Sequence, residues 1–282
     1  MKHLLLEDSV FLWNKMSKSL FYDSTSFNHV LIEKQTDGLK WFCDTLAKPD
    51  NLHSIELDEA TLDKETIELI DTLIKKGFAK ISDDSRSCAI PPVLLLNGDL
   101  DHMTKELCRD YIYTRNLYDY ISQFTFFVDK EHDIFKRERE LIIEEIKKKN
   151  PSFEYDIIPY LEYEKNDDVA CDSRINEEAI FSAHINKRRI FIHQKINVKY
   201  WGHLFAFPNG EIHPHPTNDS GSLLGWIWEP IIPMVGKELL ENHAWRRVRD
   251  FSPCKNCVYQ WLCPSPTIKE RAQGISHVCE VL

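Results

Sequence analysis

The sequence predicts a multidomain protein of mixed α+β and α/β class, and three observations support this prediction. The chain has 282 residues, enough for two or three domains of ordinary size. Strand-like runs alternate with helical patterns along residues 93–198, an order that favours a partly parallel sheet with crossover helices. From residue 199 onward Trp, Pro, Gly and His become dense, and a group of cysteines follows near the end.

The composition and net charge of the chain argue against nucleic acid and membranes as its binding partners. Hydrophobic residues make up 43% of the chain and charged residues 28%, as in globular proteins. The net charge of −10 argues against nonspecific nucleic-acid binding, which requires a basic patch. No run approaches the roughly 20 apolar residues of a membrane span, and MKHLLLEDSVF lacks the apolar core of a signal peptide. We therefore expect a cytoplasmic protein that binds neither nucleic acid nor a membrane.

Residues 1–85 are predicted to form a first domain. Three apolar runs within residues 9–33 predict an antiparallel meander. A helix is expected over residues 36–46, and a second helix begins after Asp63 and ends at Gly77 with lysines in its last turn. Short strands are expected at residues 53–57 and 78–81.

The middle domain is predicted to span residues 93–198. Its expected strands are residues 93–98, 124–128, 155–163 and 188–193, of which 155–163 forms either a strand pair or one strand bent at Pro159. Its expected helices are residues 105–120, 134–149 and 176–184. Residues 199–282 are assigned to a third domain. There the segment 204–216 predicts a hairpin that turns at Pro208-Asn209-Gly210, and a helix is expected over residues 236–245.

Four cysteines near the C-terminus form a metal-ligand pattern. Their spacing is C-x2-C-x5-C-x15-C, and the residues are Cys254, Cys257, Cys263 and Cys279. Thiolates are soft ligands that bind either zinc or an iron–sulfur cluster, and the spacing does not choose between them. The other four cysteines are solitary and are expected to be core residues.

The stretch CKNCVYQWLCPSP, followed by HVCEV, resembles the SPASM region of radical-SAM-type peptide maturases, in particular pseudo-radical-SAM proteins of ribosomal peptide (RiPP) maturation systems. The resemblance implies that the four cysteines bind one [4Fe–4S] cluster, with Zn²⁺ as the alternative. Thr267 and His215 stand near the positions of second-cluster cysteines, so one cluster is expected rather than two. His213 and His215 are expected to be surface residues rather than ligands.

The radical-SAM signature C-x3-C-x2-C is absent from the sequence. The middle domain is therefore expected to be a shortened, degenerate remnant of the β/α partial barrel, and no cleavage of S-adenosylmethionine is expected.

Residues 9–81, which end in LIDTLIKKGFAKIS, resemble the PqqD-type winged-helix domain that recognises precursor leader peptides. An unrelated small α+β module is the alternative. The resemblance implies that a leader peptide adds as a strand to one edge and lies against the last helix. The implied edge is His29, Val30, Leu31, Ile32 and Glu33, and the facing residues are Leu69, Leu73 and Lys76.

These features together predict a noncatalytic accessory protein of ribosomal peptide maturation. It would bind a precursor leader peptide, a catalytic peptide-modifying enzyme, or both, and its metal site would be structural. One alternative is an active redox maturase that uses its single cluster for electron transfer. The other is a zinc-stabilised interaction protein unrelated to peptide maturation.

Overall fold

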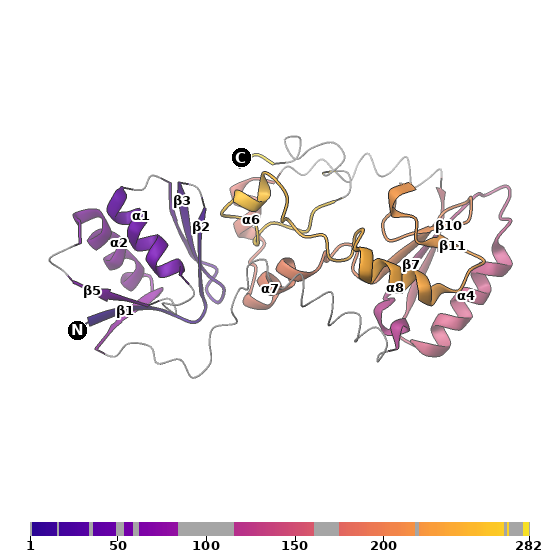
Figure 1. Ribbon diagram of the computed structural model, residues 1–282, viewed down its shortest axis with the longest axis horizontal. Helices are drawn as coiled ribbons and strands as arrows, with labels where there is room; N and C mark the ends of the chain where they lie inside the picture. The colour runs from indigo at the N-terminus through magenta and orange to yellow at the C-terminus, as the bar shows by residue number, and fades with distance from the viewer. Residues whose placement is uncertain are drawn as a thin grey trace. The chain divides into compact units, whose positions relative to one another are not determined.

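The computed structural model divides into two compact units, and each unit combines segments that are far apart in the sequence (Figure 1). The first unit contains residues 1–97, 177–191 and 251–263, and the second contains residues 98–176, 192–250 and 264–282. The structure describes residues 2–15, 17–33, 36–48, 54–58, 62–83, 116–160, 175–217, 220–267, 270 and 279–281.

Two small antiparallel sheets form the N-terminal part of the first unit. One sheet has the order β5-β1-β6, with β5 at Ser54–Leu57, β1 at Lys2–Leu6 and β6 at Ala79–Ser82. The other has the order β2-β3-β4, with β2 at Val10–Lys15, β3 at Lys18–Asp23 and β4 at His29–Ile32. The second sheet confirms the predicted meander. The central strand β1 was not expected from the sequence, although its three leucines are buried.

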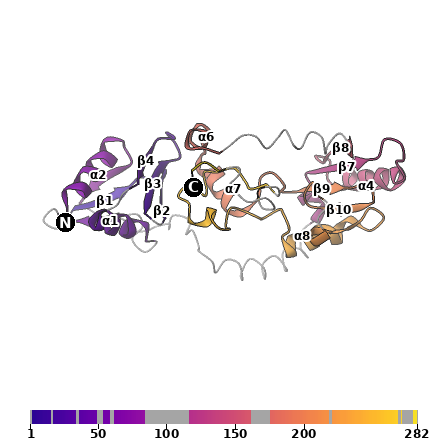
Figure 2. The same ribbon diagram turned by 90° about the horizontal axis from the view of Figure 1, so that it is seen from above.

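Two capped helices pack against these sheets, and Figures 1 and 2 both show them alongside β1. Helix α1 spans Asp37–Ala47, and the Thr36 hydroxyl accepts the Leu39 N–H at its start. Helix α2 spans Lys64–Lys75, and the Asp63 carboxylate caps its first turn. Gly77 follows α2 with a φ of 73°, which glycine adopts without steric cost. Both predicted helices are therefore confirmed.

A five-stranded sheet organises the second unit. Its order is β11-β10-β9-β7-β8. Strand β7 pairs in parallel with β8 on one side and with β9 on the other, which confirms a partly parallel sheet. The elements are β7 (Gln123–Val128), α4 (Lys136–Lys149), β8 (Glu154–Pro159), β9 (His203–Ala206), β10 (Glu211–His213) and β11 (Gly225–Trp226).

This sheet crosses the domain boundary predicted between residues 198 and 199. Strands β7 and β8 belong to the predicted middle domain, whereas β9, β10 and β11 belong to the predicted C-terminal one. The hairpin of β9 and β10 was predicted correctly, because its Pro-Asn-Gly turn is a strong local signal. Its pairing with β7 is a long-range contact that no local pattern encodes.

Other elements differ from their expected form. The predicted strand at residues 188–193 is wrong, because these residues lie in helix α7 (Lys187–Lys195). Asn186 starts that helix by accepting the Arg189 N–H with its side chain, and Ile190 is its buried residue. The remaining elements are η2 (Leu117–Tyr120), α6 (Glu177–Ser182), η3 (Ser220–Ser222), α8 (Ile231–Glu241) and η4 (Cys254–Asn256).

Helix α8 begins earlier than the predicted helix at residues 236–245 and ends at Glu241. The predicted strand at 93–98 and most of the predicted helix at 105–120 lie outside the described residues, as do the boundary after residue 85 and residues 161–163. Within the described ranges, no helix is both long and apolar enough to cross a membrane.

His203 is a titratable residue held inside the sheet of the second unit. Its Nε2 lies 2.8 Å from the Thr125 hydroxyl, and its ring stacks on Phe205 at 3.9 Å. Burial lowers the pKa of His203 to about 4, although the nearby Asp156 opposes this shift. The folded state therefore holds a neutral imidazole.

This shift predicts a pH-dependent stability. The pKa of an unfolded histidine is about 6.5, so the unfolded chain binds the proton first as the pH falls. The stabilisation is complete above about pH 6.5 and is lost as the pH falls toward 4. Between pH 7 and pH 4 the free energy of unfolding should fall about 3 kcal/mol more in the wild type than in His203→Gln. Urea unfolding followed by tryptophan fluorescence measures this, and parallel pH profiles would contradict it.

Glu238 fixes the loop that follows α8. Its carboxylate accepts the N–H groups of His243, Ala244 and Trp245 at 2.7–2.9 Å, and its side chain is completely buried. Burial raises the pKa of Glu238, and the three N–H donors oppose that shift. An acceptor-only group suits this place, because all three partners are donors.

Glu238→Gln should therefore destabilise the second unit. The amide turns an NH2 group toward backbone donors, and charged hydrogen bonds of this kind contribute about 1.5–3 kcal/mol each. The control is Glu241→Gln in the same helix. Its carboxylate is 49% exposed and lies 2.8 Å from the His243 ring, and the change should alter stability by less than about 0.5 kcal/mol. Thermal unfolding measures both variants, and equal melting temperatures would refute the role of Glu238.

Candidate functional site

Strand β4 forms an edge of the β2-β3-β4 sheet, and among the described strands it pairs with β3 alone. The Asp23 N–H donates to the Asn28 carbonyl at 2.9 Å, so Asp23 and Asn28 are a hydrogen-bonded pair, and every second pair along β3 and β4 is hydrogen-bonded in the same way. Because successive residues of an antiparallel strand point their backbone groups to opposite sides, Val30 faces β3 and His29 and Leu31 face outward. The Lys76 ammonium confirms this direction, since it donates to the His29 carbonyl at 3.2 Å.

The side chains of β4 divide between the two faces of the sheet. Val30 and Ile32 pack, partly buried, against the apolar core that α1 and α2 share with the sheet. His29 and Leu31 therefore lie on the opposite face, with Tyr22. We call this the outer face, and its residues are Phe11, Trp13, Leu20, Tyr22, His29 and Leu31.

Segments from much later in the chain cover the outer face. The Tyr22 hydroxyl donates to the Ile185 carbonyl at 2.9 Å, and burial raises the pKa of Tyr22 to about 12. The Phe11 ring meets Phe191 edge to face at 5.8 Å. These contacts explain why the outer face is apolar in a sheet that would otherwise expose it.

Aromatic rings continue this cover to the edge strand. The His29 ring stacks on Phe181 of α6 with their centroids 3.5 Å apart and their planes at 1°. Phe181 in turn meets Tyr259 edge to face at 5.8 Å. The Tyr259 hydroxyl donates to the Glu177 carboxylate at 2.6 Å, and burial raises the pKa of Tyr259. Strand β4 and the cysteine segment are therefore joined through α6.

Three of the four predicted ligands lie in this cysteine segment. The 3-10 turn of η4 brings Cys254 and Cys257 together through a 2.9 Å hydrogen bond between their backbones. The Cys263 N–H donates to the Tyr259 carbonyl at 3.0 Å. Cys254 and Cys263 are buried and Cys257 is half-buried. Cys279 belongs to the second unit, where it forms a β-bridge with Ile175.

The four cysteines have the right chemistry to bind a metal, but the structure does not group their described side chains as a metal site. Four thiols are a suitable ligand set for zinc or an iron–sulfur cluster. Across the described ranges, however, no three His, Cys, Asp or Glu side chains are grouped so as to hold a metal ion. Metal binding by the four cysteines therefore stays a prediction from the sequence.

Several predicted residues lie elsewhere than expected. Leu73 is fully buried and Leu69 is 8% exposed, so both are core residues rather than parts of an open surface. His213 and His215 are also buried, in contrast to the surface positions expected for them. His213 contacts the Ser222 hydroxyl at 3.1 Å, and His215 accepts from Thr217. Thr267, which stands near the expected position of a second-cluster cysteine, exchanges two hydrogen bonds with Glu270.

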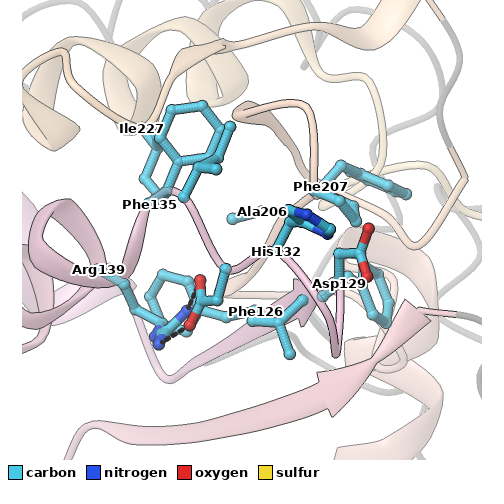
Figure 3. Close-up of a pocket in the computed structure, with 13 residues that line it drawn as sticks. Phe126, Asp129, His132, Phe135, Arg139, Ala206, Phe207 and Ile227 are labelled. Atoms are coloured by element: carbon cyan, nitrogen blue, oxygen red, sulfur yellow. Dashed lines mark hydrogen bonds and ion pairs between the residues drawn. The ribbon is translucent and has the colours of Figure 1, made fainter.

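The second unit contains a recess that the sequence did not indicate. It lies at the carboxyl end of β7, between the loop of residues 129–135 and the β9–β10 turn (Figure 3). Arg139 is nearly buried and makes two hydrogen bonds with Asp133 at 2.9 and 2.6 Å, so their charges offset each other.

Comparison of the chain with protein-family models, with curated proteins and with solved structures finds no match.

The cysteine prediction has a direct test in metal content. Anaerobically purified protein should carry bound metal, and Cys257→Ser should lose most of it, because one of four thiolate ligands is removed. Cys43→Ala is the matched control. Burial raises the pKa of the Cys43 thiol to about 11, which keeps it protonated and unsuited to bind metal. Iron, zinc and sulfide analysis distinguishes a cluster from zinc, and equal metal content in both variants would contradict the ligand assignment.

Proposed function

We propose that this chain is a noncatalytic accessory protein that binds an extended precursor peptide along the edge of β4 and presents it to a separate catalytic peptide-modifying enzyme. The observation that carries the proposal is the outward direction of the N–H and C=O groups of His29 and Leu31 on a short edge strand. Such an edge provides main-chain hydrogen bonds to an incoming strand. The resemblance of residues 9–81 to leader-binding domains supports the same assignment.

Lys76 partly blocks this edge. Its ammonium occupies the outward carbonyl of His29, at the place where the N–H of an added strand would donate. Charged lysines commonly protect exposed edges from unwanted pairing. A peptide therefore exchanges one lysine contact for a series of backbone hydrogen bonds, and the exposed lysine moves into solvent.

The cysteine segment supports a structural rather than a catalytic role. Cys254 and Cys263 are buried beside Val258, Tyr259 and Leu262, all of them nearly inaccessible to solvent. A thiolate-bound metal would supply a cross-link that holds this segment in place. Held in this way, Tyr259 keeps α6 against β4.

The edge assignment is tested with peptides selected from a random display library against the full chain. Hydrogen exchange of the complexes should show added protection at the amides of His29 and Leu31. The variant Leu31→Pro removes an outward N–H, whereas the control Leu31→Ala removes the side chain and keeps that donor. Proline is tolerated in edge strands, and Leu31→Pro should bind about tenfold more weakly than Leu31→Ala.

Equal affinity of the two variants would contradict strand addition at β4. So would protection confined to other segments, such as the loop of residues 129–135.

A further inference from the structure

A peptide strand added to β4 would extend both faces of the sheet. Its side chains would point alternately to the two faces, because successive residues of a strand do so. One set would meet the side of the core helices, where Val30, Ile32 and Ile74 are partly buried apolar residues. The other set would meet the outer face, beside His29 and Leu31.

Helix α6 stands at the outer face beside this edge. Phe181 covers the His29 ring, and the Glu177 carboxylate accepts from Tyr259 next to it. Glu33 follows β4 directly, and its side chain is 64% exposed and pairs with Lys18 at 3.2 Å. Two electrostatic effects agree with this placement. Glu177 opposes the lowering of the pKa of His29 by burial and Lys76, and Glu33 adds to the raising of the pKa of Tyr259 by burial.

We propose that α6 is a second wall of the peptide site, and that it selects an extended peptide in which apolar residues alternate with basic ones. This inference rests on the proposed function. The first wall, toward Val30 and Ile32, takes the apolar side chains. The second wall, formed by Phe181, Glu177 and Glu33, takes the lysine or arginine side chains.

The chemistry of the second wall favours a cation over an anion. Its carboxylates are those of Glu177 and Glu33. Lys18 pairs with Glu33, and Lys76, which contacts the His29 carbonyl, would move away from this place when a strand adds to β4. Aromatic rings next to the carboxylates attract an ammonium or guanidinium group further. Burial and the charge of Lys76 lower the pKa of His29, which disfavours a positive charge on its ring that would repel such a group. An acidic side chain at the same place would meet like charges.

The test uses the full chain and three synthetic fluorescein-labelled peptides of equal length. One alternates valine with lysine, one alternates valine with glutamate, and one carries the valine and lysine residues in two blocks. Fluorescence anisotropy gives their affinities, and hydrogen exchange locates each peptide. The alternating lysine peptide should bind at least about fivefold more tightly than either other peptide, as expected for a favourable ion pair of about 1 kcal/mol. It should also protect the amides of His29 and Leu31.

Two variants separate the second wall from the general attraction of a chain with a net charge of −10. Glu177→Gln keeps an acceptor for the Tyr259 hydroxyl and should remove most of the preference for lysine over glutamate. Glu144→Gln is the matched control, since it makes the same charge change at an exposed position of α4 in the other unit. Glu33→Gln, at an exposed position, provides a second variant of the wall.

The outcomes distinguish this inference from the proposed function. Protection of His29 and Leu31 by the lysine and glutamate peptides alike, with equal affinity, would overturn the selection of basic residues and leave the edge site in place. A lysine preference that Glu177→Gln and Glu33→Gln change no more than Glu144→Gln would also overturn it. Failure of every peptide to protect the β4 amides would overturn the edge site and the inference together.

Discussion

The stack of the His29 ring on Phe181 is the interaction on which the organisation of the first unit depends. It joins an edge strand formed early in the chain to a helix that comes some 150 residues later, at a centroid spacing of 3.5 Å. The β2-β3-β4 sheet buries one face against α1 and α2, and the other face would be left exposed without the returning segments. Burial of aromatic residues on that outer face is a strong driving force for the return.

The first unit is assembled from segments that are distant in the sequence. The N-terminal part contains two small sheets and two helices, and residues 177–191 cover the outer face of its β2-β3-β4 sheet. A peptide at the β4 edge, as proposed, would therefore contact both the N-terminal strands and the later segment of residues 177–191. Phe181 meets Tyr259 of the cysteine segment edge to face, so α6 links that segment to the β4 edge.

The sequence predicted those elements whose signals are local. Thr36 and Asp63 cap the two N-terminal helices, and the Pro-Asn-Gly turn specifies the β9–β10 hairpin. Strand β1 was missed because three successive leucines do not alternate as a half-buried strand does. The spacing of Ile190 and Ile192 by two predicts a strand where the structure has helix α7, which Asn186 starts just before them.

Features that depend on distant contacts could not be predicted. No pattern within residues 9–33 shows that α6 covers their outer face, and none shows that β9 pairs with β7 across the expected domain boundary. The sequence places His29 and Leu31 on an edge strand, as the structure does, whereas it gives no sign that Phe181 and Glu177 lie near them, because that proximity arises only when the chain returns. The resemblance to leader-binding domains implies that Leu73 faces a peptide, whereas packing buries it completely.

The most direct test of the contact between Phe181 and His29 is the proton NMR spectrum of the His29 ring in the full chain. If Phe181 covers His29, its ring protons should shift upfield and show nuclear Overhauser effects to the Phe181 ring, and Phe181→Leu should abolish the shift while the sheet stays folded. A His29 ring with ordinary shifts and no effect to Phe181 would show that the outer face is not covered, and would contradict the composite first unit.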